Sequence, residues 1–371
     1  MLAVAVISRG SASAPAARAA AGPFVYVANS KSDKISQYSA SASDFGALTP
    51  LAPATVSTGS FPYGIAIDRQ GNSVYAADVD ANEVSRYTIN PITGQLTAKT
   101  PATVAAGRGS VEVAVTPNGE SAYVVDGKSN AVSQYSINPT TGNLTSKSPA
   151  TVATGRNAEA IAISPNGKYV FVSNCSACRV ALRGLHPPSP SKPPTATIWE
   201  YRINQRTGAL SPVGTVVTGT GANGIAITPD GKSLYVAIDA VWQYTISAST
   251  GKLTPKSPAT IAAPGHAHEI AIAPNGKNAY VVTVADNSVS QYSINPKTGA
   301  LSSRPVSTAR TVLHPEAIKL NPDGTSAYVT SENDPRLSQY SIDPTTGKIA
   351  PMSPAAVPTT GRGSLGLAIM P

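Results

Sequence analysis

Charged residues are scarce in this chain of 371 residues, since only 13% are Asp, Glu, Lys or Arg against roughly a quarter in an average soluble protein. Long apolar runs are also missing, because no stretch approaches the ~18 consecutive apolar residues that a membrane-spanning helix needs. Methionine and cysteine are rare as well, with three and two residues. This composition excludes a coiled coil, a helical bundle and a membrane-spanning helix.

Turn-forming and strand-forming residues take the place of the missing types. The chain has 30 glycines, 32 prolines and 15 tyrosines. It is too rich in Val, Ile, Ala and Tyr to be disordered. We therefore expect a protein rich in strands and turns.

The net charge is +8, but the basic residues are scattered and form no run of four. Nucleic-acid-binding proteins usually concentrate their basic residues along one face, so we expect no nucleic-acid partner. A weak attraction to an anionic polymer of the cell envelope is compatible with this charge. We expect a monomer.

The first 21 residues differ in composition from the remainder. An apolar stretch, Met1 to Ile7, precedes small residues that include Ala17-Arg18-Ala19, a triplet of the A-x-A form found at signal-peptidase sites. We expect residues 1–21 to be a signal peptide or a disordered leader, and the protein to be secreted or located in the cell envelope. Without a functional signal, it would be cytoplasmic.

Internal repetition dominates residues 22–371. The string Ser133-Gln-Tyr-Ser-Ile-Asn-Pro-Thr-Thr-Gly142 recurs with variations, and so does Ala162-Ile-Ser-Pro-Asn-Gly-Lys168. An aromatic residue recurs at spacings of 49, 48, 48, 64, 45 and 48 residues: Tyr26, Tyr75, Tyr123, Phe171, Tyr235, Tyr280 and Tyr328. Seven units of about 48 residues account for everything after the leader.

Each unit predicts four short strands, A to D. Strand A is a small apolar run such as 224–228, and a Pro-Asn/Asp-Gly turn leads to strand B, as in 122–125. Strand C alternates in polarity, as in 132–137. Strand D, as in 144–153, carries prolines that suit an outer edge (Pro101, Pro149, Pro258 and Pro354).

Four-stranded units repeated around an axis form a β-propeller. The chain begins at a strand B (24–28) and ends at a strand A (365–369). We therefore predict an all-β, seven-bladed β-propeller over residues 22–371, in which the C-terminal strand A joins the N-terminal strands B, C and D.

These repeats resemble the YVTN-type propellers and the seven-bladed lactonase family, which includes 6-phosphogluconolactonases. The resemblance rests on Ile270-Ala-Ile-Ala-Pro-Asn-Gly-Lys-Asn-Ala-Tyr-Val-Val282 and on the strand C string with its Asn-Pro-x-Thr-Gly turn. Family members often carry a histidine at the start of strand A and a glutamate soon after the tyrosine strand. Here Glu332 matches the glutamate, whereas the histidine position holds Glu269, with His268 one residue earlier.

Strand direction puts the D-to-A and B-to-C loops on one face, where the repeats diverge, and a site can be built there. Four glutamates lie at the start of strand A, three arginines follow the glycine that closes strand D, and five aspartates lie in B-to-C loops, as do Glu332 and His186. We expect these residues on one face: Glu112, Glu159, Glu269, Glu316, Arg108, Arg156, Arg362, Asp78, Asp126, Asp239, Asp286, Asp334, His186, His266, His268 and His314.

The unit with the 64-residue spacing contains an insertion at about 174–197. It includes Cys175-Ser-Ala-Cys178, the only cysteines of the chain. In an exported protein this pair favours a local disulfide, and reduced thiols are the alternative in a cytoplasmic one. Because the next unit has a short loop at the same place, we expect the insertion to cover part of the polar face.

We predict a lactonase-like carboxylic-ester hydrolase that opens the lactone ring of a small anionic or sugar-derived substrate at the channel mouth. Glu269 or His268 would act as the base and Glu332 as a supporting acid or base. The arginines would bind the substrate anion, and the remaining polar residues would line the site. We expect no cofactor or metal. The alternative is a non-catalytic exported propeller that binds a protein partner or an envelope glycan.

Overall fold

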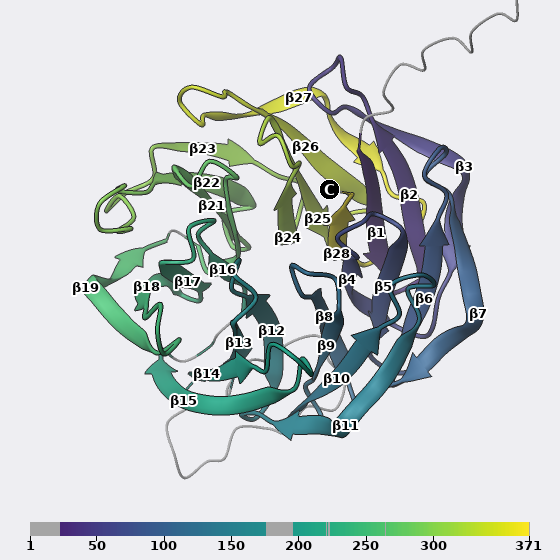
Figure 1. Cartoon of the computed structure of the whole chain (residues 1–371). Helices are drawn as coiled ribbons and strands as arrows, with labels where there is room; N and C mark the ends of the chain where they lie inside the picture. Colours follow the sequence, from purple (N-terminus) through teal and green to yellow (C-terminus); the bar gives the residue numbers. More distant parts are fainter. Residues whose placement is uncertain (1–22, 176–195, 220, 222, 264, 371) are drawn as a thin grey trace, which may run out of the picture.

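The computed structural model describes residues 23–175, 196–219, 221, 223–263 and 265–370. Within them the protein is a ring of seven four-stranded antiparallel sheets (Figure 1). No helix in the described ranges has the length and apolar character needed to cross a membrane.

The strands occupy the predicted positions in each blade. The A strands, which surround the centre of the ring, are β4 (Pro62–Ile67), β8 (Ser110–Val115), β12 (Ala158–Ile163), β16 (Ile225–Ile227), β20 (Ala267–Ile272), β24 (Pro315–Leu320) and β28 (Ser364–Ile369). The B strands are β1 (Phe24–Asn29), β5 (Ser73–Asp78), β9 (Ser121–Asp126), β13 (Tyr169–Asn174), β17 (Ser233–Ala237), β21 (Asn278–Thr283) and β25 (Ser326–Ser331).

The two outer strands complete each blade. The C strands are β2 (Lys34–Ala40), β6 (Glu83–Ile89), β10 (Ala131–Ile137), β14 (Ala196–Ile203), β18 (Ala240–Ile246), β22 (Ser288–Ser293) and β26 (Arg336–Ile342). The D strands are β3 (Leu48–Ser57), β7 (Leu96–Ala105), β11 (Leu144–Ala153), β15 (Leu210–Thr218), β19 (Leu253–Ala262), β23 (Ser307–Arg310) and β27 (Ile349–Pro358).

The ring closes as the sequence predicts. The C-terminal strand β28 pairs with β1 in the order β28-β1-β2-β3, so one sheet contains both ends of the repeat region. Tyr26 of β1 lies opposite Ala368 of β28. The first blade therefore has the same four strands as the other six.

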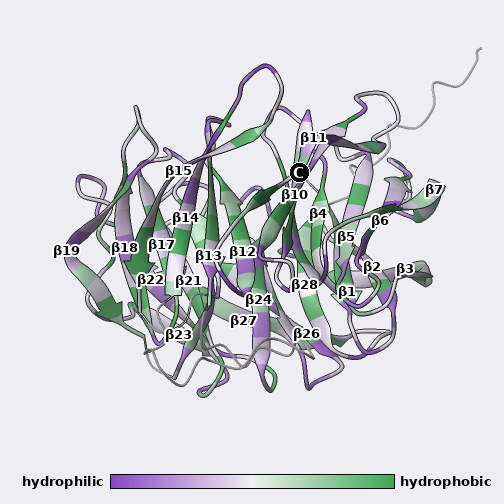
Figure 2. Ribbon diagram, turned by 90° about the horizontal axis from the view of Figure 1, so that it is seen from below, coloured by the Kyte–Doolittle hydropathy of each residue, from purple (hydrophilic) through white to green (hydrophobic). Residues whose placement is uncertain are grey.

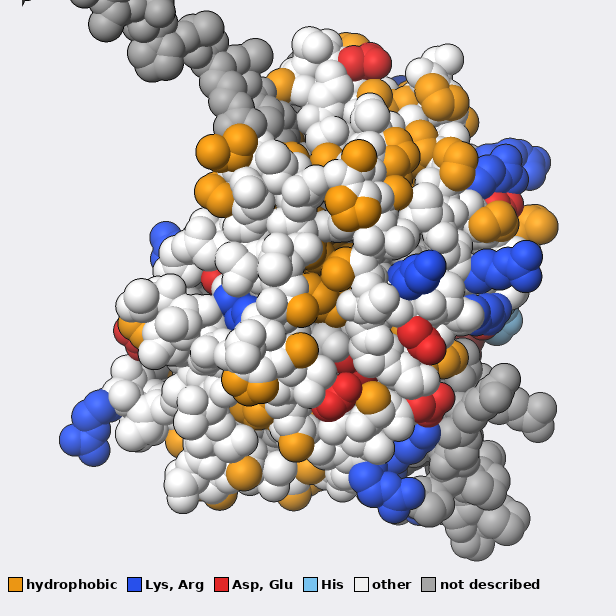
Figure 3. Space-filling model, turned by 90° about the vertical axis from the view of Figure 1, so that its right-hand side faces the viewer, with side chains coloured by type: hydrophobic (Ala, Val, Ile, Leu, Met, Phe, Trp, Pro, Cys, Tyr) orange, Lys and Arg blue, Asp and Glu red, His pale blue; other side chains and the backbone are white. Residues whose placement is uncertain are grey.

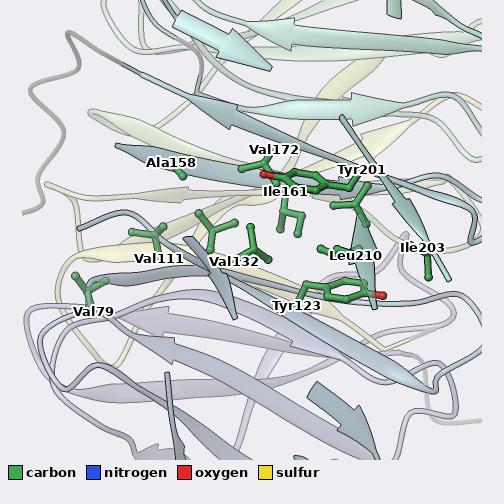
Figure 4. Close-up of a cluster of buried hydrophobic side chains, with 12 residues drawn as sticks. Val79, Val111, Tyr123, Val132, Ala158, Ile161, Val172, Tyr201, Ile203 and Leu210 are labelled. Carbon is green, nitrogen blue, oxygen red and sulfur yellow. The ribbon is translucent and has the colours of Figure 1, made fainter. Parts of the chain in front are cut away.

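The apolar core lies between the blades. Every residue of the B strands is buried, whereas most residues of the D strands are exposed or half-buried. Figure 4 shows one such interface, where Val111 and Tyr123 of the third blade pack near Ile161 and Tyr201 of the fourth. Figure 2 shows the hydrophobic residues along the strands and most hydrophilic residues in the loops of the two faces.

The recurring sequence string is explained by bonds that join neighbouring blades. The Tyr123 hydroxyl of β9 donates to the carbonyl of Gly208 in the next blade, and the Tyr135 hydroxyl of β10 donates to the carbonyl of Ala105 in the preceding one, both at 2.7 Å. Gln134 spans the gap as well, because its Nε2 donates to the Pro149 carbonyl and its Oε1 accepts from the Leu210 N–H. These residues recur because each blade needs the same connections.

The outer wall reflects the low charge of the sequence. In Figure 3 uncharged atoms cover most of this side, and several Lys and Arg side chains lie towards its right-hand edge. The fold thus leaves the loops and the central channel as the places where chemically active side chains gather.

Candidate functional site

A cavity of about 70 Å³ lies inside the central channel. Its wall comes from the A strands of all seven blades, which bring together residues far apart in the sequence. The lining residues are Tyr63, Ile65, Glu112, Ala160, Ile161, Ile225, His268, Glu269, Glu316, Ala317, Lys319, Leu365, Gly366 and Leu367. Three of the four predicted A-strand glutamates and His268 therefore meet at one cavity.

Two of these glutamates lie beside a glycine of the preceding blade, which leaves room for their carboxylates. Glu112 and Glu269 occupy the third position of β8 and β20, and glycine occupies that position in the preceding blade. A Cβ atom on Gly64 would lie 2.7 Å from Oε2 of Glu112, and one on Gly224 would lie 2.7 Å from Oε2 of Glu269. The two carboxylates thus lie over bare backbone, which no other residue type would leave open.

Burial makes these carboxyl groups poor acids. It raises the pKa of Glu112 and of Glu159 to about 8 and also raises the pKa of Glu269, although the Lys319 charge offsets part of the effect for Glu112 and Glu269. Oε1 of Glu159 has no hydrogen-bond partner among the described residues, and only 6% of this residue is exposed. Some of the carboxyl groups in the channel are therefore protonated near neutral pH and can donate hydrogen bonds.

Glu316 connects the channel to its mouth. Its Oε2 lies 3.4 Å from Nε2 of His268, and its Oε1 lies 3.0 Å from Nδ1 of His314. Nδ1 of His268 also lies 3.1 Å from the main-chain oxygen of Glu316. Hydrogen bonding to Glu316 raises the pKa of His314. The predicted residues His268 and His314 thus both contact the predicted Glu316.

Glu332 lies beside this group at the mouth. Its Oε2 is 3.7 Å from Nδ1 of His314, and its Oε1 is 3.2 Å from Nζ of Lys31. The Glu332 N–H donates to the His314 carbonyl, which ties the two loops together. Glu332 itself does not line the channel cavity.

Two ionisable residues of the cavity, Tyr63 and Lys319, were not predicted. Tyr63, at the second position of β4, has its pKa raised by burial and by four surrounding glutamates. Lys319 supplies the ammonium group in the cavity wall. The sequence contained a signal for Lys319, because the fifth position of strand A is lysine in this blade and alanine in the other six: Ala66, Ala114, Ala162, Ala226, Ala271 and Ala368.

The predicted arginines do not reach the cavity. Arg108, Arg156 and Arg362 are exposed in the loops before β8, β12 and β28, and none of them lines the cavity wall. His266 is also exposed, and its Nδ1 lies 2.7 Å from Oδ1 of Asp239. These residues surround the mouth rather than the channel.

Two of the predicted loop aspartates have structural roles instead. Asp78 and Asp126 end strands β5 and β9 and are fully buried. Oδ2 of Asp126 accepts from the Ser133 hydroxyl at 2.7 Å, and its Oδ1 accepts from the Gly107 N–H. Burial raises the pKa of both carboxyl groups to about 7. They join strands within a blade and are not available to a ligand.

The insertion falls mostly outside the described residues, as do His186 and Cys178. Cys175, at its start, is buried and disulfide-bonded. The predicted cover over the polar face stays a prediction.

A larger groove of about 870 Å³ lies between the second and third blades, on the opposite face. Its wall contains turn residues such as Asn118, Asn138 and Gly142, which belong to strings that recur along the chain. It contains none of the predicted site residues. The channel is therefore the better candidate for a specific site.

Comparison with protein families identifies the repeat pattern. The family model described as "Lactonase, 7-bladed beta-propeller" matches residues 6–111, 95–265 and 255–362. No curated protein matches the sequence.

Several solved structures share the fold. A provisionally assigned 6-phosphogluconolactonase from Bacteroides fragilis is 16% identical, with a TM-score of 0.77 over 95% of this chain and 99% of the other. The periplasmic gluconolactonase of Pseudomonas aeruginosa is 16% identical, with a TM-score of 0.71 over 94% and 99%. A functionally unknown protein from Desulfotomaculum acetoxidans is 18% identical, with a TM-score of 0.69 over 94% and 98%. Identities this low establish the fold, and activity has to be argued from the site.

Proposed function

The chain belongs to the seven-bladed β-propeller lactonase family, and from this premise we propose that it hydrolyses the lactone ring of a small sugar-derived or anionic substrate at the mouth of the central channel. One observation carries the proposal. Ionisable side chains from four blades line a single cavity: Tyr63, Glu112, His268, Glu269, Glu316 and Lys319.

The size of the cavity limits how a substrate binds. A volume of about 70 Å³ accommodates roughly five water molecules, whereas drug-sized ligands occupy pockets of about 300 Å³ or more. A sugar lactone would therefore insert only its carbonyl edge, together with the attacking water. Its hydroxyl or anionic groups would remain at the mouth, within reach of the loops that carry Arg108, Arg156 and Arg362.

The contacts favour Glu269 over His268 as the base. Both ring nitrogens of His268 face oxygens of Glu316, so they are less free to accept a proton from water. Glu269 lies in the cavity wall with a raised pKa, which brings its basicity closer to that required near neutral pH.

The reaction would proceed in two steps. Ionised Glu269 removes a proton from water as the oxygen attacks the lactone carbonyl, and the Lys319 ammonium and the protonated Glu112 stabilise the negative oxygen that forms. The tetrahedral intermediate then collapses and the bond between the acyl carbon and the ring oxygen breaks. Glu269, which accepted a proton from water in the first step, gives that proton to the ring oxygen and returns to its ionised form.

We further propose that the protein is exported from the cytoplasm. Export is supported by the signal-like residues 1–21 and by the disulfide-bonded Cys175, since structural disulfides persist mainly in oxidising compartments.

The test is hydrolysis of a lactone panel, followed by proton release and corrected for the uncatalysed rate. The panel contains sugar lactones, phosphorylated sugar lactones and simple γ- and δ-lactones. We expect Glu269→Gln and Lys319→Met to lower kcat by about 100-fold or more, and Arg108→Ala to raise KM with little change in kcat. Glu120→Gln, on an exposed turn of the opposite face, is the control.

Two results would contradict the proposal. Full activity in Glu269→Gln would exclude that residue as the base. Inactivity of the folded wild-type protein toward the whole panel would favour the alternative function, in which the exported propeller binds a protein partner or an envelope glycan.

A further inference from the structure

We infer that the channel mouth contains a binding site for one divalent transition-metal ion, formed by His314, Glu316 and Glu332. The ligand atoms would be Nδ1 of His314 and one carboxylate oxygen from each glutamate. These three atoms lie within 4.8 Å of one another. The sequence placed these residues on one face but did not show that they converge, because Glu332 lies in a B-to-C loop, His314 in a D-to-A loop and Glu316 at the start of strand A.

The distances fit a shared ion. Nδ1 of His314 lies 3.0 Å from Oε1 of Glu316 and 3.7 Å from Oε2 of Glu332. Around an ion with metal–ligand bonds of about 2.1 Å, neighbouring ligand atoms are separated by about 3.0 Å in octahedral and 3.4 Å in tetrahedral coordination. The two separations from Nδ1 therefore need only small adjustments to receive the ion, and the two carboxylate oxygens, which lie within 4.8 Å of each other, would move together on binding.

The hydrogen bonding at this point leaves a role for a cation. Two carboxylates converge on one ring nitrogen, and a single N–H can donate well to only one of them. Oε1 of Glu332 is paired with Lys31, which leaves Oε2 facing His314. A metal ion bound between Nδ1 of His314 and the two glutamates would interact with both carboxylates at once.

The surroundings hold the ligands in place. Glu316 is 7% exposed, and its second oxygen faces Nε2 of His268. The backbone N–H of His314 donates to the Asn287 side chain at 2.7 Å, and Lys31 orients Glu332. Partners of this kind around the ligands are typical of metal sites.

The charge of Glu316 is also felt by a buried carboxyl group of another blade. Glu159 is buried to more than nine-tenths, its Oε1 has no partner among the described residues, and its charge interacts with that of Glu316. A divalent ion bound by Glu316 would reduce the excess negative charge that the channel carboxylates share.

The ligand set indicates the kind of ion. One imidazole nitrogen with two carboxylate oxygens suits Zn²⁺ or Mn²⁺, whereas Ca²⁺ takes six to eight oxygen ligands. Three protein ligands leave coordination positions for water, and His314 has 42% of its side chain exposed at the mouth. The site is thus open in the manner of catalytic metal centres rather than closed.

The inference is tested by binding and does not depend on lactone hydrolysis. The full chain is treated with a chelator, dialysed and titrated calorimetrically with ZnCl₂ and with MnCl₂, and the bound metal is measured after gel filtration. We expect one ion of at least one of these metals per chain. His314→Ala and Glu332→Gln should each weaken binding at least tenfold.

His266→Ala is the matched control, because this histidine also pairs with a carboxylate, Asp239, on an exposed loop of the same face. It should bind metal as the wild-type protein does. Failure of the wild-type protein to bind either ion would overturn the inference. Binding that survives in both cluster variants, or that is lost equally in His266→Ala, would place the ion elsewhere and would overturn it as well.

Discussion

The buried Glu159 makes the stability of the propeller depend on pH in a way that one substitution should remove. Glu159→Gln keeps the shape of the side chain but replaces the carboxyl group with an amide that does not ionise. The residue is suited to this test because it is 6% exposed and one of its oxygens has no partner among the described residues. Ionising it in place therefore carries a desolvation cost that no local donor offsets.

The direction of the effect follows from proton binding. The pKa of Glu159 is about 8 in the folded protein against an ordinary value of 4.5. Between these values the folded state binds more protons than the unfolded state, so raising the pH through this window lowers the free energy of unfolding. The cost is absent below pH 4.5 and complete above pH 8.

The size of the effect can be bounded. Each pH unit between the folded and unfolded pKa corresponds to about 1.4 kcal/mol, so the cost above pH 8 has a ceiling of about 5 kcal/mol. Water entering the channel and local relaxation reduce the desolvation of a buried charge. We expect Glu159→Gln to be more stable than the wild-type protein by about 1–3 kcal/mol at pH 9, and equally stable near pH 4.5.

The assay is urea denaturation at several pH values between 4.5 and 9. A chelator is present so that a bound metal ion does not change the ionisation of Glu159. Glu120→Gln, which is exposed on an A-to-B turn, controls for the loss of one negative charge and should follow the wild-type profile. A Glu159→Gln variant that shows the wild-type pH dependence, or that is less stable at pH 9, would refute the reasoning.

Two further substitutions test the packing around the channel and between the blades. Gly224→Ala would put a Cβ atom 2.6 Å from Cα of Glu269. We expect this substitution to lower the free energy of unfolding by about 2–4 kcal/mol in urea titrations and to abolish any lactonase activity. Stability and activity close to those of the wild-type protein would show that the strand can shift at little cost. Gln134→Leu removes the acceptor of the buried Leu210 N–H and should lower the free energy of unfolding by about 1–3 kcal/mol in the same assay. The control, Gln70→Leu at an exposed position, should change it little. Equal effects of the two substitutions would contradict the inter-blade role of Gln134.

The architecture was predictable because the same interface recurs between the blades. The tyrosines of strands B and C and the glutamine of strand C repeat in the sequence since their hydrogen bonds to adjacent blades repeat in space. The position of Glu269 and Glu316 at the channel followed from the register of strand A in the same way. A residue placed within a repeated strand inherits the geometry of that strand.

Loop residues carry less information of this kind. Arg108, Arg156 and Arg362 share a register, which locates their backbone at the mouth, yet the direction of a side chain in a loop depends on local backbone angles that the repeat does not fix. The same limit applies to Asp78 and Asp126: their recurrence at the end of strand B reflects a bond to the serine of strand C and not a ligand site.

Departures from the repeat are more informative about function than its recurrences. At the third position of strand A, five blades have glycine or alanine, and only Glu112 and Glu269 depart from this pattern. Glycine in the preceding blade, at positions 64 and 224, gives each carboxylate room, but an added Cβ atom there would also meet the main chain of the following strand. Gly366 is equally crowded by the main chain of Tyr63 although no glutamate follows it, so the glycines mainly reflect the close approach of the A strands. The stronger argument for a chemical purpose is therefore the exchange of small side chains for the carboxylates of Glu112 and Glu269 and of alanine for the ammonium group of Lys319, since all three side chains line the same cavity.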